Sequence, residues 1–194
     1  MLNLRNIIVL IAICISIGCN QDHGISQIDL YDRNDKAQQI SFDNYDATVI
    51  TFLGPECPLS ENYTKTINDL DSTFKSNVHF INIFPGTFYS KEAIDSFMHT
   101  YNVMQNCLLD ADFDLVRELH ATITPESFVF DRNGKLVYSG AIDNWAVDLG
   151  QKRQVITEFY VRDVLNAMLQ HKEIPYTKTT AVGCFIETEA KQHH

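Results

Sequence analysis

The stretch of sequence that decides the fold reads Thr51-Phe52-Leu53-Gly54-Pro55-Glu56-Cys57-Pro58-Leu59-Ser60. Residues 47–53 are a continuous, mostly apolar run rich in β-branched side chains, which is typical of a buried central strand. Residues 59–74 follow with the apolar spacing of an amphipathic helix. Cys57 therefore lies at a strand-to-helix junction, where backbone N–H groups converge and the positive end of the helix dipole favours a thiolate.

The residues beside Cys57 support a reactive thiol. Gly54-Pro55 allows a tight turn, which is predicted to lift Cys57 into solvent. Pro58 suits the first turn of a helix because the N–H that it lacks would be unpaired there. The alternative is an inert cysteine packed under the helix, and the position and flanking residues favour the reactive interpretation.

The rest of the chain predicts an α/β domain of alternating strands and helices. The additional predicted strands are residues 27–31, 39–42, 78–84, 106–109, 127–131 and 135–140. The additional predicted helices are residues 90–101, 113–119 and 154–170. Turn residues Asn34-Asp35 and Asn133-Gly134 mark two hairpins. This order indicates one domain, residues 27–172, with a central mixed β-sheet flanked by helices on both faces, followed by a C-terminal tail, residues 173–194.

The N-terminus has the pattern of an export signal. One positive charge, Arg5, precedes an apolar run at residues 7–17 that is too short for a transmembrane helix. Ser16-Ile17-Gly18-Cys19 resembles the lipobox of bacterial lipoproteins. That resemblance implies cleavage after residue 18, acylation of Cys19, a short tether at residues 19–26, and a location in the cell envelope, anchored to the membrane by lipid and facing the periplasm or the exterior. An uncleaved anchor, or a plain signal with a chance Cys19, is the alternative.

Composition limits the partners. The 25 acidic residues outnumber the 15 basic ones, giving a net charge of −10, which argues against nucleic acid or an anionic membrane surface as a partner. No phosphate loop, zinc cluster or serine–histidine–aspartate elbow is evident in the sequence. A copper site at Cys57 and His120 would normally need a second nearby cysteine, so His120 is interpreted as a loop residue. We expect neither a cofactor nor a metal.

A second feature precedes the strand at residues 127–131. Thr124-Pro125 stands at its entrance, where proline usually marks a special turn. A cis bond there could place the Thr124 backbone beside Cys57, ready to receive an extended partner chain. The base rate of cis X–Pro bonds favours an ordinary trans bond.

Together these segments resemble the thioredoxin-like redoxin superfamily, and most closely its bacterial redoxin (AhpC/TSA) group. The resemblance extends over residues 27–186 and includes Phe128-Val129-Phe130-Asp131, Gly140-Ala141-Ile142-Asp143-Asn144 and Gly183-Cys184-Phe185-Ile186. It implies a thioredoxin-like fold, with Cys57 at the nucleophile position and Pro125 at the cis-proline position.

The sequence departs from both standard mechanisms of that superfamily. A dithiol oxidoreductase has a second cysteine where this chain has Ser60. Typical peroxiredoxins carry Pro-x-x-x-Thr-x-x-Cys, and here Ile50 and Gly54 replace the proline and the threonine, so the usual peroxide-polarising hydroxyl is missing. Glu56, if close to the thiol, would raise its pKa.

The remaining cysteines suggest how the site could be completed. Cys107 lies in an apolar strand and is expected to pack as a small hydrophobic residue. Cys184 follows a glycine in the tail, and we hypothesise that the tail returns across the domain from Pro175 and pairs Cys184 with Cys57. The pair could be a catalytic disulfide with Cys184 as the resolving thiol, or a static staple.

Three functions remain open. The leading one is a cell-envelope thiol–disulfide oxidoreductase in which Cys57 acts on protein thiols or disulfides, with Cys184 resolving and the Thr124-Pro125 turn shaping the substrate groove. A thiol-dependent peroxidase is the second, and a non-catalytic binding module with a structural disulfide is the third. Trp145 could cover the site or a partner surface.

Overall fold

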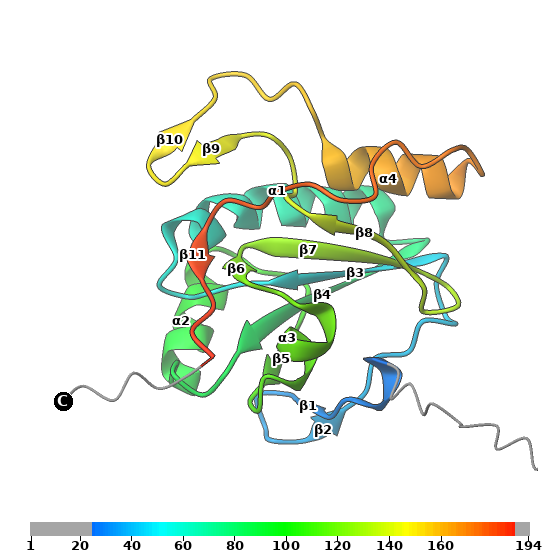
Figure 1. Cartoon of the computed structure of the whole chain (residues 1–194). Coiled ribbons are helices and arrows are strands. Elements are labelled where there is room, and N and C mark those ends of the chain that lie inside the picture. The colour runs from blue at the N-terminus through cyan, green and yellow to red at the C-terminus, as the bar shows by residue number, and fades with distance from the viewer. Residues whose placement is uncertain (1–24, 189–194) are drawn as a thin grey trace, which may run out of the picture.

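The computed structural model describes residues 25–188, and a mixed seven-stranded sheet forms the centre of that part of the chain (Figure 1). In spatial order the sheet runs β2 (Ala37–Gln38), β1 (Leu30–Tyr31), β5 (Asn106–Asp110), β4 (Val78–Pro85), β3 (Ala47–Phe52), β7 (Glu126–Asp131), β8 (Leu136–Gly140). The helices are η1 (Ile25–Gln27), α1 (Pro58–Phe74), α2 (Lys91–Thr100), α3 (Asp114–Leu119) and α4 (Tyr160–Leu169). Two small antiparallel ribbons complete the structure, β9 (Ala146–Asp148) with β10 (Gln151–Lys152) and β6 (Ile123–Thr124) with β11 (Cys184–Phe185).

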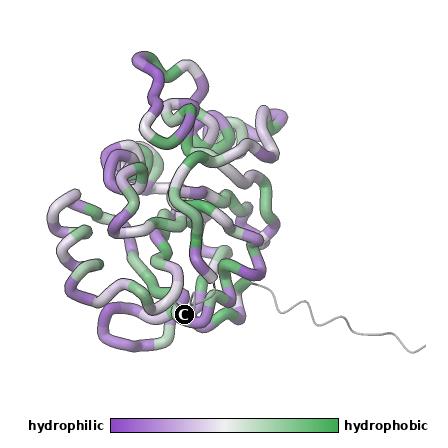
Figure 2. The backbone as a smooth tube through the Cα atoms, turned by 60° about the vertical axis from the view of Figure 1, so that its left-hand side comes forward, coloured by the Kyte–Doolittle hydropathy of each residue, from purple (hydrophilic) through white to green (hydrophobic). Residues whose placement is uncertain are grey.

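The predicted central strand is confirmed. Every residue of β3 is buried, and the strand pairs parallel with β4 and antiparallel with β7, with Ile50 opposite both Ile81 and Phe128. Successive side chains of β3 point to opposite faces, so Val49 and Ile50 belong to different hydrophobic clusters. Both faces of the sheet are therefore apolar and must be covered. In Figure 2 the apolar strands lie inside the molecule, with more polar segments around them.

Helices cover both faces, as predicted. The first cluster packs the apolar sides of α1, α2 and α4 on one face of the sheet, through residues such as Ile67, Phe97 and Val164. The second packs Leu115 and Val116 of α3, with Leu30 of β1, on the other face. The β3–α1 junction lies at the carboxyl end of the central strand β3. The loop after β4 and the β6–β11 ribbon lie beside it.

Three predicted elements are wrong in their limits. The predicted strand 27–31 is reduced to β1, because residue 27 belongs to η1. The predicted strand 39–42 is instead β2, because the Asp32 carboxylate accepts hydrogen bonds from the backbone N–H groups of Asn34 and Lys36 and closes a tight turn that pairs Leu30 with Gln38. The predicted helix 154–170 begins only at Tyr160.

The segment before α4 is held in non-helical form by Asn144. The Asn144 backbone N–H donates to the Glu158 carbonyl (3.1 Å), and its side chain bonds both the backbone and the hydroxyl of Thr157. These bonds hold the chain ahead of Tyr160 against the Asn144 loop and replace the first turns of the predicted helix.

The C-terminal tail returns across the domain, as hypothesised. After α4, the Thr179 N–H donates to the Ser139 carbonyl (3.0 Å), and the Ala141 N–H donates to the Thr179 hydroxyl (3.0 Å). The tail then pairs through β11 with β6 (Figure 1). Residues 1–24, which contain the predicted signal and most of the tether, lie outside the described residues, as do residues 189–194. No helix in the described range 25–188 is long and apolar enough to cross a bilayer.

Candidate active site

Cys57 is the N-cap residue of α1. Its backbone is extended (φ −91°, ψ 113°), its N–H donates to the Gly54 carbonyl (3.0 Å), and its carbonyl accepts from the Glu61 N–H (3.1 Å). Pro58 occupies the first helical position, as predicted. The sulfur therefore faces the unpaired N–H groups at the start of a 17-residue helix.

The expected exposure of Cys57 is wrong. Only 2% of the residue is accessible to solvent, because the β6–β11 ribbon lies over the turn that follows β3. The Cys57 thiol donates a hydrogen bond to the Thr124 carbonyl (3.0 Å). The thiol is thus covered, but by polar backbone and by the C-terminal tail rather than by hydrocarbon alone.

The pKa of Cys57 nevertheless lies below its ordinary value. Burial has the largest effect and raises the pKa, but hydrogen bonds from the thiol and backbone of Cys184 and from the backbone and hydroxyl of Ser60 together lower it by more. Burial, rather than Glu56, is the main effect opposing ionisation. Cys184 behaves in the opposite way: burial, followed by its hydrogen bond to Cys57 and the charge on that sulfur, raises its pKa to about 12. Of the two thiols, Cys57 therefore has the lower pKa and ionises first.

Ser60 has a definite role at the position where a dithiol enzyme has its second cysteine. Its hydroxyl accepts a hydrogen bond from the Gly54 N–H (3.1 Å) and donates to the ionised Cys57 sulfur. The residue is fully buried. Ser60 therefore stabilises the thiolate and fixes the turn, while the second thiol comes from the tail.

The Thr124–Pro125 peptide bond is cis, as the resemblance implied. Thr124 is paired with Cys184 in the β6–β11 ribbon, and its hydroxyl donates weakly to the Cys184 carbonyl (3.5 Å). Gly183 permits this approach, since a Cβ on it would lie 2.0 Å from the Thr124 carbonyl oxygen. The backbone edge predicted to receive an extended partner chain is occupied by the chain's own tail.

A cleft of about 370 Å³ opens beside the two sulfurs. Its lining comes from the β3–α1 turn, the loop after β4, the Thr124 turn and β11: Glu56, Cys57, Pro85, Phe88, Tyr89, Thr124, Cys184, Phe185, Ile186 and Glu187. Burial, and then the charge of Glu56, raise the pKa of the Tyr89 hydroxyl, which keeps it protonated. Tyr89 was missed by the sequence analysis because it lies in a loop without periodicity, far from Cys57 in the chain.

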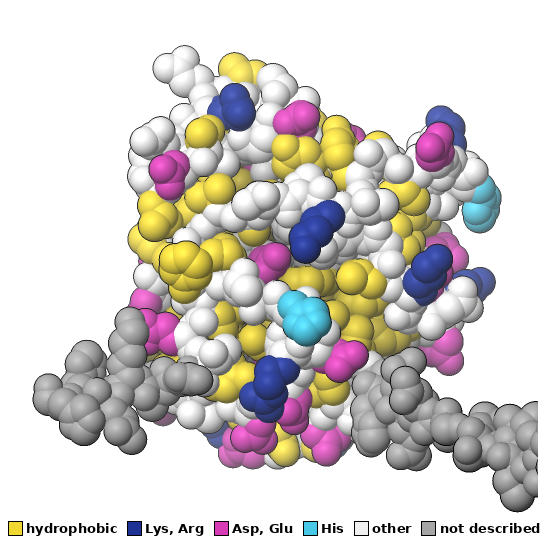
Figure 3. Space-filling model, viewed as in Figure 1, with side chains coloured by type: hydrophobic (Ala, Val, Ile, Leu, Met, Phe, Trp, Pro, Cys, Tyr) yellow, Lys and Arg dark blue, Asp and Glu magenta, His cyan; other side chains and the backbone are white. Residues whose placement is uncertain are grey.

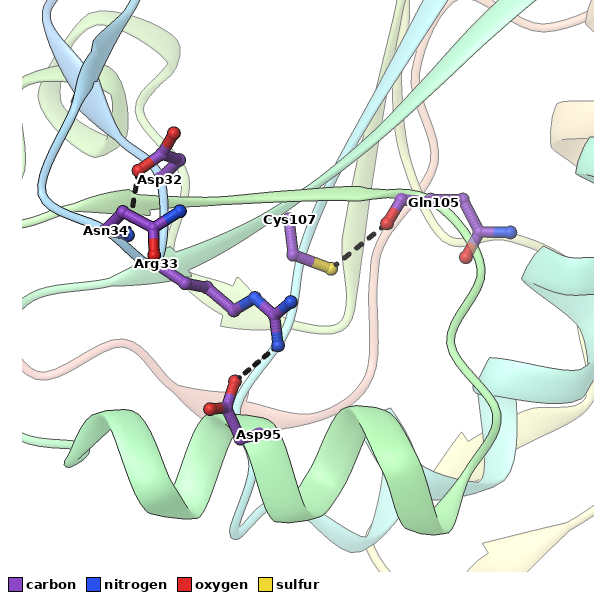
Figure 4. Close-up of polar contacts among 6 residues, drawn as sticks. All are labelled: Asp32, Arg33, Asn34, Asp95, Gln105 and Cys107. Atoms are coloured by element: carbon purple, nitrogen blue, oxygen red, sulfur yellow. Dashed lines mark hydrogen bonds and ion pairs between the residues drawn. The ribbon is translucent and has the colours of Figure 1, made fainter.

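The other candidate residues lie elsewhere. Burial raises the pKa of Cys107 to about 12, and its thiol donates to the Gln105 carbonyl at 3.5 Å, close to the Arg33–Asp95 ion pair (Figure 4). Cys107 thus packs as the small buried residue that was predicted. His120 is exposed at the end of α3 and does not line the cleft. Within residues 25–188, no group of three or more His, Cys, Asp or Glu side chains is arranged to hold a metal ion.

Trp145 lies beside the site rather than over it. Its ring packs edge-on against Tyr63 (5.4 Å between centroids), and its backbone N–H donates to the Asp143 carboxylate (2.9 Å). The Tyr63 hydroxyl donates to the same carboxylate (2.8 Å). These bonds position the β9–β10 hairpin next to the start of α1.

Comparisons with solved structures identify proteins of similar fold. A hypothetical protein from Sinorhizobium meliloti 1021 is similar in structure, with a TM-score of 0.73 and 21% identity over 84% of this chain and 91% of the other. An uncharacterised conserved protein from Geobacillus kaustophilus has a TM-score of 0.71 and 22% identity over 82% and 87%. The thioredoxin domain of a thiol-disulfide oxidoreductase from Bacteroides vulgatus gives 0.52 and 15% over 58% and 81%.

At these identities the similarity establishes the thioredoxin-like fold. A search among curated proteins gave no match. The sequence pattern of the AhpC/TSA family matches residues 26–139, which include β3, Cys57 and the cis-proline turn. On that match, over more than half of its length, the chain belongs to the AhpC/TSA family.

Proposed function

We propose that the protein carries out thiol–disulfide exchange with Cys57 and Cys184 as a redox-active pair. The observation that carries the proposal is the placement of the two cysteines. Thr124 accepts the hydrogen bond of the Cys57 thiol through its carbonyl (3.0 Å) and pairs with Cys184 in the β6–β11 ribbon, and both cysteines line the same cleft. A thiolate beside a protonated second thiol is the reduced form of a dithiol centre. Cys184 supplies the resolving thiol that Ser60 cannot.

Each half of the cycle has identifiable residues. In the reduced form Ser60 and Cys184 stabilise the Cys57 thiolate, and when Cys57 is protonated the Thr124 carbonyl accepts its hydrogen bond. In the oxidised form Cys57 and Cys184 are joined, and two electrons have passed to the oxidant. A reduced form stabilised in this way makes the disulfide a stronger oxidant.

Activity assays on cysteine variants test the proposal. Wild type should form a Cys57–Cys184 disulfide, found by peptide mapping without reduction, and should catalyse oxidation of dithiols or thiol-dependent reduction of insulin. Cys57→Ser and Cys184→Ser should lose turnover, whereas Cys107→Ala should keep it, because the Cys107 thiol is buried away from the cleft. Mapping that finds Cys57 free, or joined to Cys107, contradicts the proposal.

A specific observation favours thiol-dependent peroxidase activity as the second candidate. A Cβ at Gly54 would lie 3.1 Å from the Thr124 hydroxyl oxygen and 3.2 Å from the Tyr89 hydroxyl oxygen. Two hydroxyl groups therefore converge where the typical peroxidase motif has its threonine. They could polarise a peroxide that is small enough to reach the buried sulfur. Cys57 would then form a sulfenic acid, which condenses with the Cys184 thiol to a disulfide and water.

Two assays separate the candidates. Insulin reduction or dithiol oxidation without peroxide consumption supports the oxidoreductase, and peroxide consumption alone supports the peroxidase. Inactivity in both assays, with a Cys57 pKa near the ordinary ~8.5 of a thiol, supports the non-catalytic binding module.

We also propose that the protein acts in the cell envelope, anchored through Cys19. The lipobox-like Ser16-Ile17-Gly18-Cys19 supports this location, where disulfides persist. Metabolic labelling with a radioactive fatty acid should mark the wild type and not Cys19→Ala. Equal labelling of both, or of neither, contradicts the anchor.

A further inference from the structure

The two sulfurs of the pair differ in accessibility. Cys57 is 2% exposed and lines the cleft described above, called here the first cleft. Cys184 is partly exposed and lines a second cleft as well. It stands next to Phe185, which is 79% exposed. A folded client can therefore contact Cys184 without any movement of β11, whereas Cys57 is covered.

The second cleft lies between the start of α1, the β9–β10 hairpin and β11, and has a volume of about 380 Å³. Its lining residues are Pro58, Leu59, Asn62, Trp145, Leu149, Gly150, Gln151, Lys152 and Cys184. Leu149, at the tip of the hairpin, is 60% exposed. Apolar side chains gather on this side of the molecule, over β11 and the hairpin (Figure 3).

The charges of the two clefts are opposite. Glu56 and Glu187 line the first cleft, whereas Lys152 is the single charged residue lining the second in the part of the chain that the structure describes. The Lys152 ammonium lies 5.6 Å from the centre of the Trp145 ring, which keeps it at the cleft wall. The attacking species in disulfide exchange is a thiolate, so its approach is favoured beside Lys152 and opposed beside two carboxylates.

We propose that client proteins exchange with Cys184 rather than with Cys57: a client cysteine thiolate enters through the second cleft and attacks the Cys184 sulfur of the Cys57–Cys184 disulfide. The inference rests on the proposed function, and it assigns the site of the mixed disulfide within it. The client is a protein segment with a dithiol and an apolar residue beside the attacking cysteine, which Leu149 and Trp145 would contact.

The exchange balances as follows. A client–Cys184 bond forms, the Cys57–Cys184 bond breaks, and its electron pair leaves on Cys57 as a thiolate. The second client cysteine, after loss of its proton to solvent, attacks the client sulfur of the mixed disulfide. Cys184 leaves with that electron pair and takes up a proton. Two client thiols become one disulfide, and the protein disulfide becomes a dithiol.

Cys57 suits the role of leaving group. Thiols of lower pKa leave faster, and the Ser60 hydroxyl and backbone N–H remain bonded to Cys57 while Cys184 is engaged with the client. Burial, the largest cause of the raised pKa of Cys184, does not depend on the state of Cys57 and makes Cys184 the poorer leaving group of the two. The client thiolate therefore attacks the Cys184 sulfur first, because Cys184 is the more accessible sulfur and Cys57 is the better leaving group.

Trapping the mixed disulfide tests the site of attack. Oxidised full-length protein is mixed with a peptide that contains one cysteine beside a leucine, quenched in acid within the first turnover, and mapped by mass spectrometry. We expect the peptide on Cys184, with Cys57 free, in about tenfold excess or more over the reverse arrangement. A peptide found mainly on Cys57, or equally on both, overturns this inference and leaves the proposed function intact. No peptide on either cysteine overturns both.

Charge variants test the route. Lys152→Gln should lower the second-order rate constant of peptide exchange by about 3–10-fold at low salt, with a smaller effect at high salt. Lys172→Gln, an exposed lysine beyond α4, makes the same change in net charge and should leave the rate constant within about twofold. A rate constant unchanged by Lys152→Gln and raised by Glu56→Gln would place the client in the first cleft and overturn the proposal.

Discussion

At the scale of single residues, the proposed reaction requires Cys57 to ionise while it is almost completely covered, and its pKa is lowered in spite of that burial. Its thiolate has two stabilising neighbours, Ser60 on its own helix and Cys184 on the tail. Ser60 also accepts from the buried Gly54 N–H, so one hydroxyl group serves both the thiolate and the turn.

Ser60→Ala should therefore raise the pKa of Cys57 and destabilise the fold. The thiolate loses a hydrogen bond, and the Gly54 N–H is left unpaired in a buried position, which costs about 1–3 kcal/mol. The pH dependence of iodoacetamide labelling measures the first effect, and urea unfolding the second. The labelling curve of Cys57 should lie below that of an ordinary thiol in wild type and move to higher pH in the variant.

Controls for this experiment are present in the same chain. Ser72→Ala alters an exposed serine of α1 and should leave the labelling curve in place. Cys107 and Cys184, with a pKa of about 12 each, should remain unlabelled across the neutral range. A Cys57 curve that is the same in Ser60→Ala and wild type contradicts the role given to the hydroxyl.

The location of the site was predictable at this scale, and its surroundings were not. An apolar strand followed by a Cys-Pro pair and an amphipathic helix predicted both the place of Cys57 and the tendency to ionise. Its burial was mispredicted because the cover comes from Thr124 and the tail, which contact Cys57 only in the folded chain. Tyr89 could not be found for the same reason.

At the scale of elements, the two-residue strand β11 brings the second thiol to the first. It is held by pairing with β6 and by the Ile186 N–H, which donates to the Thr122 carbonyl (2.9 Å). The strand can approach so closely because residue 183 has no side chain.

Gly183→Ala should detach β11 from β6 and separate the pair. The added Cβ would meet the Thr124 carbonyl oxygen at 2.0 Å and the Ile123 side chain at 2.7 Å, and a backbone atom cannot move away as a flexible side chain would. We expect disulfide formation to slow by at least about tenfold and the pKa of Cys57 to rise, since Cys184 no longer donates to it. Rates of Cys57–Cys184 formation, measured by quenched alkylation, check this.

Gly150→Ala provides the comparison. Gly150 has a positive φ (77°), but a Cβ added to it would meet no atom within 4 Å, so its substitution strains the hairpin tip without touching the pair. A normal rate of disulfide formation in Gly183→Ala would show that β11 is not what holds Cys184 in place.

The long periodic elements were predictable, whereas the short ones were not. β3, α1, β4 and the β7–β8 hairpin are each long enough for apolar periodicity or a turn pair to identify them. The strands β6, β9, β10 and β11 have two or three residues each, too few for a periodic signal, and pairing across the fold defines them. The start of α4 was misplaced because Asn144, distant in the sequence, bonds the segment ahead of it.

At the scale of the whole molecule, the disulfide would close a loop of about 127 residues between two parts of the fold that are already in contact. In a static staple, this closure would stabilise the oxidised form by about 4–5 kcal/mol at every pH. In a redox-active pair the Cys57 thiolate stabilises the reduced form. The oxidised form then exceeds the reduced form in free energy of unfolding by less than in a static staple.

The difference in free energy of unfolding between the oxidised and the reduced protein should therefore become smaller as the pH rises. The pKa of Cys57 is lower in the folded than in the unfolded state, so its contribution to the reduced form is present above the unfolded value and is lost as the pH falls through the folded value. The free energies of unfolding of both forms, measured by urea titration from acid pH up to the ordinary thiol pKa of ~8.5, check the trend. Above that pH the raised pKa of Cys184 destabilises the reduced form and opposes it. A constant difference across that range indicates a static staple.

The tail strand β11 also determines how Cys184 competes with thiols in solution for reaction with Cys57. Because β11 holds Cys184 beside Cys57 within one chain, the effective concentration of the second thiol is far above that of dilute thiols in solution. In the proposed peroxidase reaction, a sulfenic acid on Cys57 would therefore be captured by Cys184 before an outside thiol arrives. Among residues 25–188, the third cysteine, Cys107, is buried and does not line the cleft, so it does not compete with Cys184 for this reaction.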